Sequence, residues 1–362
     1  MQNELPSDVV SEHEVLVRRD GGLGHLILNR PKAINALNQG MVDRLAATLV
    51  EWADDDAIRT VLLTGAGDRG LCAGGDIVAI YRSVLDGRHD AERFWGAEYL
   101  LDAAIARYPK PYVALMDGLV LGGGIGLSAH GRIRVVTERT RVGMPEVSIG
   151  FFPDVAGTYL LARAPGELGT HLALTGGTAS GADAIALGLA DHFVPSEQVP
   201  ALVEALETGD AAETIAEFAV EPPASELLAQ RAWIDESYAG NDARVIVERL
   251  GASSEPAARE AAVTILSKSP TSVAVTLSVL RRSHELPSLE AAFDRDYRIA
   301  TWFTRGTEVL EGIRAQVIDK DRDPHWSPAT LADVTAESVA AYFAPLDAGE
   351  LGLATTPTRT GS

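Results

Sequence analysis

The sequence predicts an α/β protein in which a core of alternating strands and helices precedes a helical C-terminal section. Strand and helix patterns alternate as far as about Pro195, and beyond this residue only helical patterns remain. The chain has 362 residues, of which 46% are hydrophobic, so it can bury a substantial core. We expect a core over residues 12–195, a helical section over 196–345 and a flexible tail over 346–362.

The first predicted elements are a β-hairpin and an amphipathic helix. The strand patterns Val15–Arg18 and Leu23–Asn29 flank Asp20-Gly21-Gly22, which is typical of a hairpin turn. Asn38 is suited to cap the following helix, because its side chain can accept a hydrogen bond from a free backbone N–H. The apolar residues of this helix recur on one face, at Met41, Val42, Leu45, Leu49 and Trp52.

The same alternation continues through the rest of the core. Thr60–Thr64 is a short β-branched and apolar run that ends in glycine, which indicates a buried strand. A helix is expected near Arg93–Ala106, followed by strands at Tyr112–Met116 and Arg132–Val136. Beyond the core, prolines punctuate helices expected at 197–207, 211–219, 224–235, 255–268, 271–283 and 287–304.

The composition disfavours several classes of function. A formal net charge of −20 argues against a nucleic-acid partner, because the phosphate backbone requires a basic surface. No apolar run approaches the length of a membrane span, and the first residues lack the basic and apolar regions of a signal peptide. Cys72 is the single cysteine, so an intrachain disulfide and a cysteine-built zinc site are excluded. We therefore expect a cytoplasmic protein.

Two carboxylates stand in the almost uncharged stretch 143–158. Glu146 and Asp154 lie eight positions apart among apolar residues and glycines. An ionised carboxylate in such surroundings is costly unless it is paired, solvated in a cleft or retained for chemistry. These two residues are therefore candidates for catalysis.

Two glycine-rich segments can supply backbone amides. Ala73–Asp76 and Gly122–Gly124 each follow an apolar strand pattern and precede a helical one. Glycine permits the dihedral angles that turn an N–H outward, and two converging N–H groups would form an oxyanion hole. The alternative is a pair of tight strand-to-helix turns with close packing, which the spacing alone favours.

Other motifs do not indicate a cofactor or a nucleophile. Gly65–Gly70 fits the dinucleotide fingerprint G-x-G-x-x-G, but the following residues are too rich in glycine to continue as the required helix. No nucleophile elbow is present, and the histidines lack metal-ligand spacing. We expect His130 to be a packed or surface residue, and Cys72 to be a small buried hydrophobe rather than a thiolate.

Glu98 shares a largely apolar stripe of the helix expected near Arg93–Ala106, with Phe94, Leu101 and Asp102 three or four positions away. The residues allow two interpretations. Either the charge of Glu98 reaches water along the helix surface, which the pattern alone favours, or it lines a cleft.

Four segments taken together carry a resemblance: Asn29–Leu37, Leu71–Ile77, Leu121–Gly126 and Met144–Glu146. With these segments the chain resembles the crotonase (enoyl-CoA hydratase/isomerase) superfamily, and within it most closely the 3-hydroxyisobutyryl-CoA hydrolases. The closer likeness rests on further segments, namely Gly126–Gly131, Met144–Asp154, Glu311–Asp321 and Pro324-His325-Trp326. The resemblance extends from about residue 14 to about residue 345.

The resemblance implies a superhelix of ββα turns whose active site is covered by the C-terminal helices. It implies that the backbone N–H groups of Gly75 and Gly123 form an oxyanion hole for a thioester oxygen. Glu146 and Asp154 match the catalytic acids of the hydrolases. The further substrate-binding positions implied are Glu98, Gly122, Gly124 and Lys32, the last near the nucleotide end of coenzyme A.

Gly126 is a departure from the hydratase pattern. In the hydratases this position carries a second glutamate, so hydration by two glutamates is disfavoured here. The resemblance instead implies hydrolysis of a short-chain 3-hydroxyacyl-CoA, with 3-hydroxyisobutyryl-CoA and water giving 3-hydroxyisobutyrate and coenzyme A, in valine catabolism. The alternatives are an enoyl-CoA hydratase or isomerase that uses Glu146 alone, and a non-catalytic acyl-CoA-binding member.

The roles of the two acids stay open at the level of the sequence. Glu146 can act as a nucleophile through a mixed anhydride or as a general base, and Asp154 can orient water, bind the hydroxyl group or donate a proton. No metal or redox cofactor is expected, because coenzyme A is part of the substrate. The expected partner is an acyl-CoA, without nucleic acid or membrane, in a possible homo-oligomer.

Overall fold

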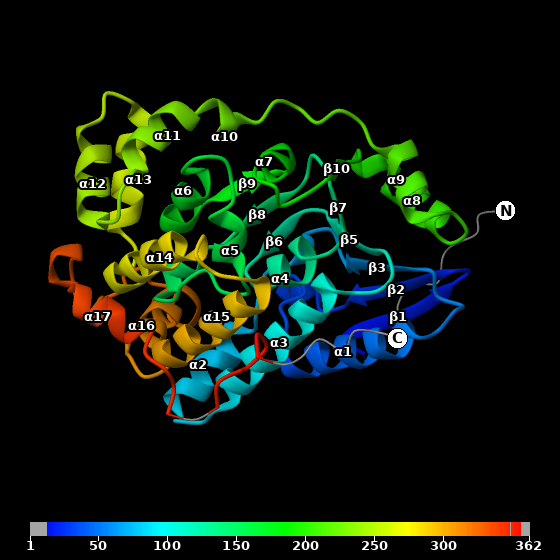
Figure 1. Cartoon of the computed structure of the whole chain (residues 1–362), viewed down its shortest axis with the longest axis horizontal. Helices are drawn as coiled ribbons and strands as arrows, with labels where there is room; N and C mark the ends of the chain where they lie inside the picture. The colour runs from blue at the N-terminus through cyan, green and yellow to red at the C-terminus, as the bar shows by residue number, and fades with distance from the viewer. Residues whose placement is uncertain (1–12, 348, 356–362) are drawn as a thin grey trace.

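Two β-sheets form the centre of the computed structural model, which describes residues 13–347 and 349–355 (Figure 1). One sheet has six strands in the order β1-β2-β3-β5-β7-β10, and the other has four in the order β4-β6-β8-β9. Part of the predicted tail, residues 348 and 356–362, and residue 12 lie outside the described residues. The strands are β1 Val15–Asp20, β2 Leu23–Leu28, β3 Thr60–Gly65, β4 Gly70–Cys72, β5 Tyr112–Met116, β6 Leu119–Leu121, β7 Ile133–Val136, β8 Arg141–Gly143, β9 Thr178–Ser180 and β10 His192–Phe193.

The chain alternates between the two sheets as it advances. β3 leads into β4, β5 into β6 and β7 into β8, so that each turn of the chain places one strand in each sheet. Strands of successive turns pair in parallel, whereas β1 pairs antiparallel with β2 through the predicted hairpin. With helices between the turns, this arrangement is the predicted superhelix of ββα units.

Helices connect these turns and make up the C-terminal part of the chain. The α-helices are α1 Gln39–Ala53, α2 Ile77–Leu85, α3 Asp90–Ala106, α4 Gly123–Ala129, α5 Gly157–Leu161, α6 Leu168–Thr175, α7 Gly181–Ala186, α8 Val199–Leu206, α9 Ala211–Phe218, α10 Glu226–Ala229, α11 Arg231–Tyr238, α12 Ala243–Ala252, α13 Pro256–Leu266, α14 Pro270–Ser283, α15 Leu289–Phe303, α16 Glu308–Ile313 and α17 Ala336–Ala341. Shorter turns are η1 Pro31–Ala33, η2 Glu146–Ile149, η3 Ser196–Gln198, the π-helical η4 Arg314–Ile318 and η5 Leu331–Asp333.

Most of the predicted elements are confirmed, and one predicted helix is divided in two. Asn38 caps α1 as expected, because its side chain accepts a hydrogen bond from the backbone N–H of Met41. The helix expected at 224–235 is divided at Gln230 into α10 and α11. Helix α2 is the helical pattern expected directly after Asp76. Helix α12 was not expected; it buries only four residues, so it has no long apolar stripe.

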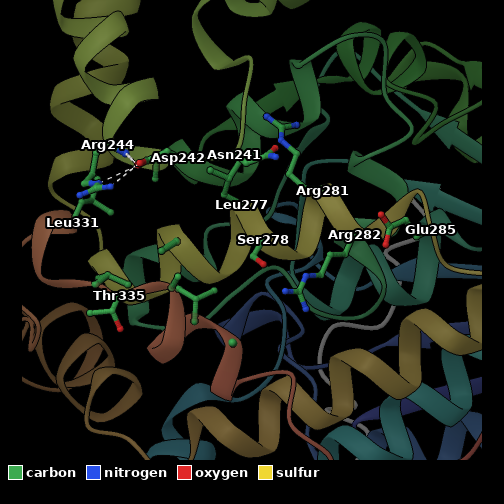
Figure 2. Close-up of a pocket in the computed structure, with 16 residues that line it drawn as sticks. Asn241, Asp242, Arg244, Leu277, Ser278, Arg281, Arg282, Glu285, Leu331 and Thr335 are labelled. Atoms are coloured by element: carbon green, nitrogen blue, oxygen red, sulfur yellow. Dashed lines mark hydrogen bonds and ion pairs between the residues drawn. The ribbon is translucent and has the colours of Figure 1, made fainter.

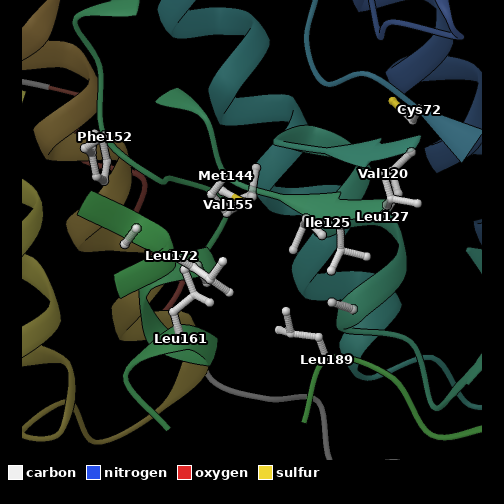
Figure 3. Packing of buried hydrophobic residues seen from close by; sticks show 14 of the residues in the cluster. Cys72, Val120, Ile125, Leu127, Met144, Phe152, Val155, Leu161, Leu172 and Leu189 are labelled. Atoms are coloured by element: carbon white, nitrogen blue, oxygen red, sulfur yellow. The ribbon is translucent and has the colours of Figure 1, made fainter. Parts of the chain in front are cut away.

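Two apolar layers enclose the six-stranded sheet. On one side α8 and α9 cover it, with Leu202 and Ile215 packing against strand residues such as Leu62 and Val113. On the other side lies the main core, part of which is shown in Figure 3, where Ile125 of α4 faces Met144, Val155 and Leu172. Among the described residues, no single helix is long and apolar enough to span a membrane; only α13 and α14 taken together, with a 115° bend, pass that test.

The C-terminal helices close over the core and bring α16 against η2. α15 packs on α3, while α16 contacts both α2 and η2 (Figure 1). Two glycines permit this approach: a Cβ atom on Gly150 would lie 3.0 Å from Val309 N, and one on Gly312 would lie 2.6 Å from Ile149 Cα. The division of the chain into two domains at residue 195 stays a prediction.

Replacing Gly150 by alanine is expected to destabilise the protein strongly. Gly150 has φ +72°, and an added Cβ would also collide with the Glu308 carbonyl group. We expect a loss of about 3 kcal/mol of unfolding free energy, measured by urea unfolding. Gly188 is a matched control, since it has φ +75° with nothing within 4 Å of an added Cβ. Gly188→Ala should cost only the backbone strain, about 1 kcal/mol, and equal losses would contradict the close-approach explanation.

Candidate active site

A cavity of about 280 Å³ collects most of the residues that the sequence singled out. Both candidate acids, Glu146 and Asp154, line it together with Glu98. Both glycine segments reach it, through Gly75 and through Gly122 with Gly123. The remaining wall is mainly apolar and includes Ile77, Ile80, Phe94, Trp95, Phe151, Val309 and Ile313. The last two belong to α16, so the C-terminal section covers this cavity.

The two glycine segments present unused backbone N–H groups. Leu37 pairs with the first segment through two backbone hydrogen bonds: its N–H donates to Gly74 O, and its carbonyl oxygen accepts from Asp76 N. The N–H of Gly75 takes no part in this pairing. Gly123 is the first residue of α4, where a backbone N–H has no partner within the helix. Among the described residues, neither N–H has a hydrogen-bond acceptor.

The two segments lie side by side at the end of strands β4 and β6. A Cβ atom built on Gly74 would lie 3.7 Å from Gly123 N, and Gly74 has φ +99°. Gly122 has φ +48°, and a Cβ there would lie 2.7 Å from Glu146 Oε1. The glycines therefore make the tight turns that one interpretation requires, and Gly75 and Gly123 line the same cavity as Glu146; the oxyanion hole stays a prediction.

Glu146 begins η2 and is buried, with 7% of its surface exposed. Among the described residues its Oε2 atom has no hydrogen-bond partner. Burial raises the pKa of this carboxyl group well above its usual range, and the nearby Asp154 raises it further. The side chain is thus free to react or to exchange a proton.

Asp154 lies beyond η2 and accepts a hydrogen bond of 2.6 Å from the Tyr99 hydroxyl group. Burial raises the pKa of Asp154 to about 7, and the hydrogen bond from Tyr99 opposes this rise. A group with a pKa near neutrality can both take up and release a proton under physiological conditions.

The backbone after Asp154 is strained. Val155 has φ 47° and Ala156 has φ 55°, values that are unusual outside glycine and especially for a β-branched residue. Distant side chains hold this segment: Asp296 of α15 accepts from Ala156 N at 2.9 Å, and the His130 ring contacts Val155 O at 2.8 Å. Such strain persists where surrounding contacts enforce it, which is common at functional sites.

Glu98 lines the cavity, so the cleft interpretation is confirmed and the solvent-exposed one is wrong. It is 2% exposed, and its Oε1 atom lies against Gly123 without a hydrogen-bond partner among the described residues. Burial raises the pKa of Glu98 well above its usual range, and Asp102 adds to the rise. The helix packs against α4, whose Gly123 lies against this carboxyl group.

Two of the predicted binding residues lie elsewhere. Gly124 is absent from the cavity wall; a Cβ there would lie 2.8 Å from Cys72 O, so it permits close packing of α4 on β4. Lys32 is exposed on η1, outside the cavity wall. As expected, Cys72 is a buried apolar residue, and burial raises the pKa of its thiol to about 12.

Four residues of this site were not expected from the sequence: Tyr99, Asp102, His130 as a backbone anchor, and Asp296. The signal that was available is the position of Tyr99 and Asp102 on the same helix as Glu98. His130 and Asp296 act on residues 25 and 140 positions away, which no local pattern reveals.

A larger cavity of about 580 Å³ lies between α12, α14 and α17 (Figure 2). It contains three arginines, but Arg244 pairs with Asp242 and Arg281 with Glu167. Its wall holds neither the two candidate acids nor the glycine segments. The smaller cavity is therefore the candidate active site.

Within residues 13–347 and 349–355, no group of three or more His, Cys, Asp or Glu side chains is arranged to hold a metal ion. The carboxyl groups of the cavity thus do not form a recognisable metal site. The absence of a cofactor stays a prediction.

The fold and the cavity together define a protein of the crotonase type. The chain belongs to the enoyl-CoA hydratase/isomerase family, whose model matches residues 23–343. Among curated relatives, the mitochondrial 3-hydroxyisobutyryl-CoA hydrolase of Homo sapiens is 37% identical over 93% of this chain and 90% of its own length. The protein of the same name from Rattus norvegicus is 39% identical over 93% of this chain and 90% of its own length.

Two solved structures are also similar. One, described as a carnitinyl-CoA dehydratase from Mycobacterium thermoresistibile, is 53% identical with a TM-score of 0.91, covering 94% of this chain and 98% of its own. The other is described as an enoyl-CoA hydratase from Rhodobacter sphaeroides. It is 40% identical with a TM-score of 0.87, covering 92% of this chain and 98% of its own.

The hydrogen bond from Tyr99 predicts a measurable pH effect. In Tyr99→Phe the ionised form of Asp154 loses a donor, so the pKa of Asp154 should rise above its present value of about 7. The limb of the kcat/KM profile that reports Asp154 should move to higher pH by about one unit. Tyr108→Phe is the control, because the Tyr108 hydroxyl group bonds Leu49 O outside the cavity. A profile of Tyr99→Phe that matches the control contradicts the assignment.

Proposed function

We propose that the protein hydrolyses a short-chain 3-hydroxyacyl-CoA thioester, converting 3-hydroxyisobutyryl-CoA and water into 3-hydroxyisobutyrate and coenzyme A. The observation that carries the proposal is one cavity that combines Glu146 and Asp154 with two free backbone N–H groups, while Gly126 offers no second glutamate. The curated relatives that match nearly the whole chain are named as hydrolases of this substrate.

The two N–H groups suit the oxygen of a thioester. As the carbonyl carbon becomes tetrahedral, its oxygen gains negative charge, and the N–H groups of Gly75 and Gly123 can donate hydrogen bonds to it. The apolar wall of Phe94, Trp95 and Phe151 keeps the site poor in water, which strengthens these interactions. Removing one donor from such a site typically costs about 10² to 10³ in kcat.

Glu146 lies next to these donors and can start the reaction by two routes. As a nucleophile, its carboxylate bonds to the carbonyl carbon, the carbon–sulfur bond breaks, and coenzyme A leaves as a thiolate that takes up a proton. Water then cleaves the mixed anhydride to release the acid and restore Glu146. As a general base, Glu146 accepts a proton from the water that attacks the same carbon, and that proton is passed to the departing sulfur.

Heavy oxygen in Glu146 after a single turnover in ¹⁸O-labelled water would demonstrate the anhydride route. Water that attacks the Glu146 carboxyl carbon of the anhydride leaves heavy oxygen in this side chain, whereas general-base catalysis places it only in the product acid. Mass analysis of the peptide that contains Glu146 detects the label. Attack on the acyl carbon of the anhydride also labels only the product acid, so a labelled Glu146 is the decisive outcome.

Two acids of the cavity wall suit a hydroxylated acyl chain. Glu98 and Asp154 both line the cavity and can form hydrogen bonds with a 3-hydroxyl group.

We further propose that Lys32 lies near the nucleotide end of coenzyme A, that no metal or redox cofactor takes part, and that the reaction belongs to valine catabolism. We also propose that the protein forms a homo-oligomer. Several curated relatives are named mitochondrial, so the cytoplasmic location is proposed only on the basis of the chain's own sequence.

The proposal is tested by following free thiol released from 3-hydroxyisobutyryl-CoA with a thiol reagent. Butyryl-CoA serves as the matched substrate without a hydroxyl group. We expect release from the hydroxylated thioester with a clearly higher kcat/KM. No release above the uncatalysed rate would overturn the proposed hydrolase activity.

A second function, hydration or dehydration at an acyl-CoA double bond, is favoured by one observation. The relative described as a carnitinyl-CoA dehydratase shares 53% of its residues with this chain. Against it, Gly126 lacks the second glutamate that the resemblance assigns to hydratases.

A further inference from the structure

Gln316 is a polar residue of the cavity wall that the proposed reaction does not yet use. It lies on the π-helical η4 and lines the cavity together with Val309 and Ile313 of α16. Within residues 13–347 and 349–355, the side-chain amide of Gln316 has no hydrogen-bond partner. This amide offers both an oxygen acceptor and an N–H donor. A molecule bound in the cavity can therefore use both.

Hydrogen bonds and ion pairs around Arg314 hold η4 in place. The guanidinium group of Arg314 donates to both carboxylate oxygens of Glu311, at 2.9 and 2.8 Å. It also donates to Asp319 at 2.8 Å and to Asp321 at 2.6 Å, so acids before and after the π-helical turn share one cation. Paired bonds of this kind fix geometry as well as adding energy, and π-helical turns are frequent at functional sites.

The cavity is deepest at its acids, and η4 lies at its opening. Glu98, Glu146 and Asp154 are buried. The half-buried residues of the wall mark the side that solvent reaches, and Ser148 and Gln316 are among them. η4 contacts both α2 and η2, which carry other half-buried residues of this rim. A thioester whose acyl group lies at the acids would therefore extend from its sulfur past this rim.

The arm of coenzyme A has the chemistry that this rim can bind. Its sulfur is followed by two methylene groups and then by an amide, which has one N–H and one C=O. Ile77 and Ile149 provide apolar surface for the methylene groups, and the amide of Gln316 is complementary to that of the arm. The Ser148 hydroxyl group lines the cavity too, and it has no hydrogen-bond partner in the described part of the chain.

We propose that Gln316 is a substrate-binding residue whose side-chain amide hydrogen-bonds the amide nearest the sulfur in the coenzyme A arm, and that Arg314 positions it. The inference rests on the proposed function for the direction of the thioester, with its acyl group toward Glu98 and Asp154. The arm does not change during the reaction, so Gln316 binds substrate and transition state alike and acts on KM rather than on kcat. Because every acyl-CoA carries the same arm, Gln316 does not select the acyl group.

Gln316→Met tests the proposal in the full-length protein, because methionine keeps the length of the side chain and removes its amide. Two thioesters of 3-hydroxyisobutyrate are compared. The N-acetylcysteamine thioester contains the first amide of the arm, and the S-pentyl thioester has a chain of the same length without it. We expect Gln316→Met to lower kcat/KM about 5- to 10-fold for the first, mainly through KM, and less than about twofold for the second. Equal losses with both thioesters would overturn the proposal.

A control variant and a change of acyl group make the test specific. Gln230 is half-buried between α10 and α11, and its side chain donates to Glu226 O outside the cavity wall. Gln230→Met should keep kcat/KM for both thioesters, and the same loss as in Gln316→Met would contradict a specific contact. The factor lost in Gln316→Met should be equal for 3-hydroxyisobutyryl-CoA and isobutyryl-CoA. A loss confined to the hydroxylated acyl group would place Gln316 at the acyl chain and overturn the proposal.

A binding measurement separates this inference from the proposed function. S-isobutyl-coenzyme A is a thioether that cannot be hydrolysed, and its dissociation constant is measured by calorimetry. It should rise about 5- to 10-fold in Gln316→Met. An unchanged dissociation constant, or no binding to the wild type, would overturn the inference. If the wild type releases no thiol from any of these thioesters, the proposed hydrolysis fails, and calorimetry still decides the role of Gln316.

A second variant covers the case in which Gln316→Met does not fold. Gln316→Glu keeps the shape of the side chain and its oxygen acceptor, but an ionised carboxylate has no N–H to donate. With the same two thioesters, a loss of kcat/KM for the N-acetylcysteamine thioester alone supports the proposal. An equal effect on both thioesters overturns it.

Discussion

Replacing Glu146 by glutamine is expected to lower kcat by about 10³-fold or more. A glutamine amide can neither form the mixed anhydride nor accept a proton from water, so both routes to hydrolysis are blocked. The fold should remain intact, because Glu146 Oε2 has no hydrogen-bond partner among the described residues and burial already disfavours its charge. We therefore expect unchanged or higher thermal stability together with the loss of turnover.

The measurement is thiol release under saturating substrate, combined with thermal unfolding of the same sample. Glu138→Gln is a suitable control, since Glu138 bonds Ser196 and lies outside the cavity wall. It should retain full activity. Turnover by Glu146→Gln within about tenfold of the wild type would show that another group performs the chemistry.

Replacing Asp154 by asparagine is expected to lower kcat by about 10² to 10³-fold while substrate binding is retained. Asparagine has the same shape, and its amide oxygen can still accept the hydrogen bond from Tyr99, so the strained segment that follows should persist. What is lost is the exchange of a proton by a group whose pKa is about 7.

The pH dependence identifies this loss. Below pH 7 Asp154 is mostly protonated and above pH 7 it is mostly ionised, so the wild-type profile should contain a limb near that pH. The limb should disappear in Asp154→Asn, and KM or the dissociation constant of a substrate analogue should change little. Near-normal turnover of Asp154→Asn would remove this residue from the mechanism.

The sequence predicted those parts of the site that depend on local patterns. Glycine runs after the short strands β4 and β6 indicated close backbone approaches, and Gly74 and Gly122 do have positive φ angles. The acids Glu146 and Asp154 were visible because their surroundings are apolar. The hairpin of β1 and β2 and the cap of α1 follow from turn and capping residues in the same way.

The sequence could not show where the acidic side chains lie relative to one another in the fold. Whether Glu98 faces water or the cavity depends on α4 and α15, which cover its helix from distant parts of the chain. For the same reason Asp102 was seen only as a polar residue in an apolar stripe, and its place beside Gly126 became clear from the packing of α3 on α4. Asp296 accepts a hydrogen bond from Ala156 N across 140 positions of the sequence, and no periodic pattern reveals a contact at that separation.

The distinction between hydrolysis and hydration depends most on Gly126. Its missing side chain leaves room for Asp102 behind the site. The cavity wall itself contains acids from α3, η2 and the segment after η2, and none from α4. Introducing the absent glutamate is not a simple conversion, because any side chain at this position would collide with Asp102.

The most direct test compares the two reactions in one enzyme preparation. Thiol release from 3-hydroxyisobutyryl-CoA and loss of the enoyl absorbance of crotonyl-CoA are measured at the same enzyme concentration and pH. We expect thiol release with a kcat/KM at least about 10²-fold above that of hydration. Efficient hydration of crotonyl-CoA without thiol release from the hydroxylated thioester would contradict the assignment of this site to hydrolysis.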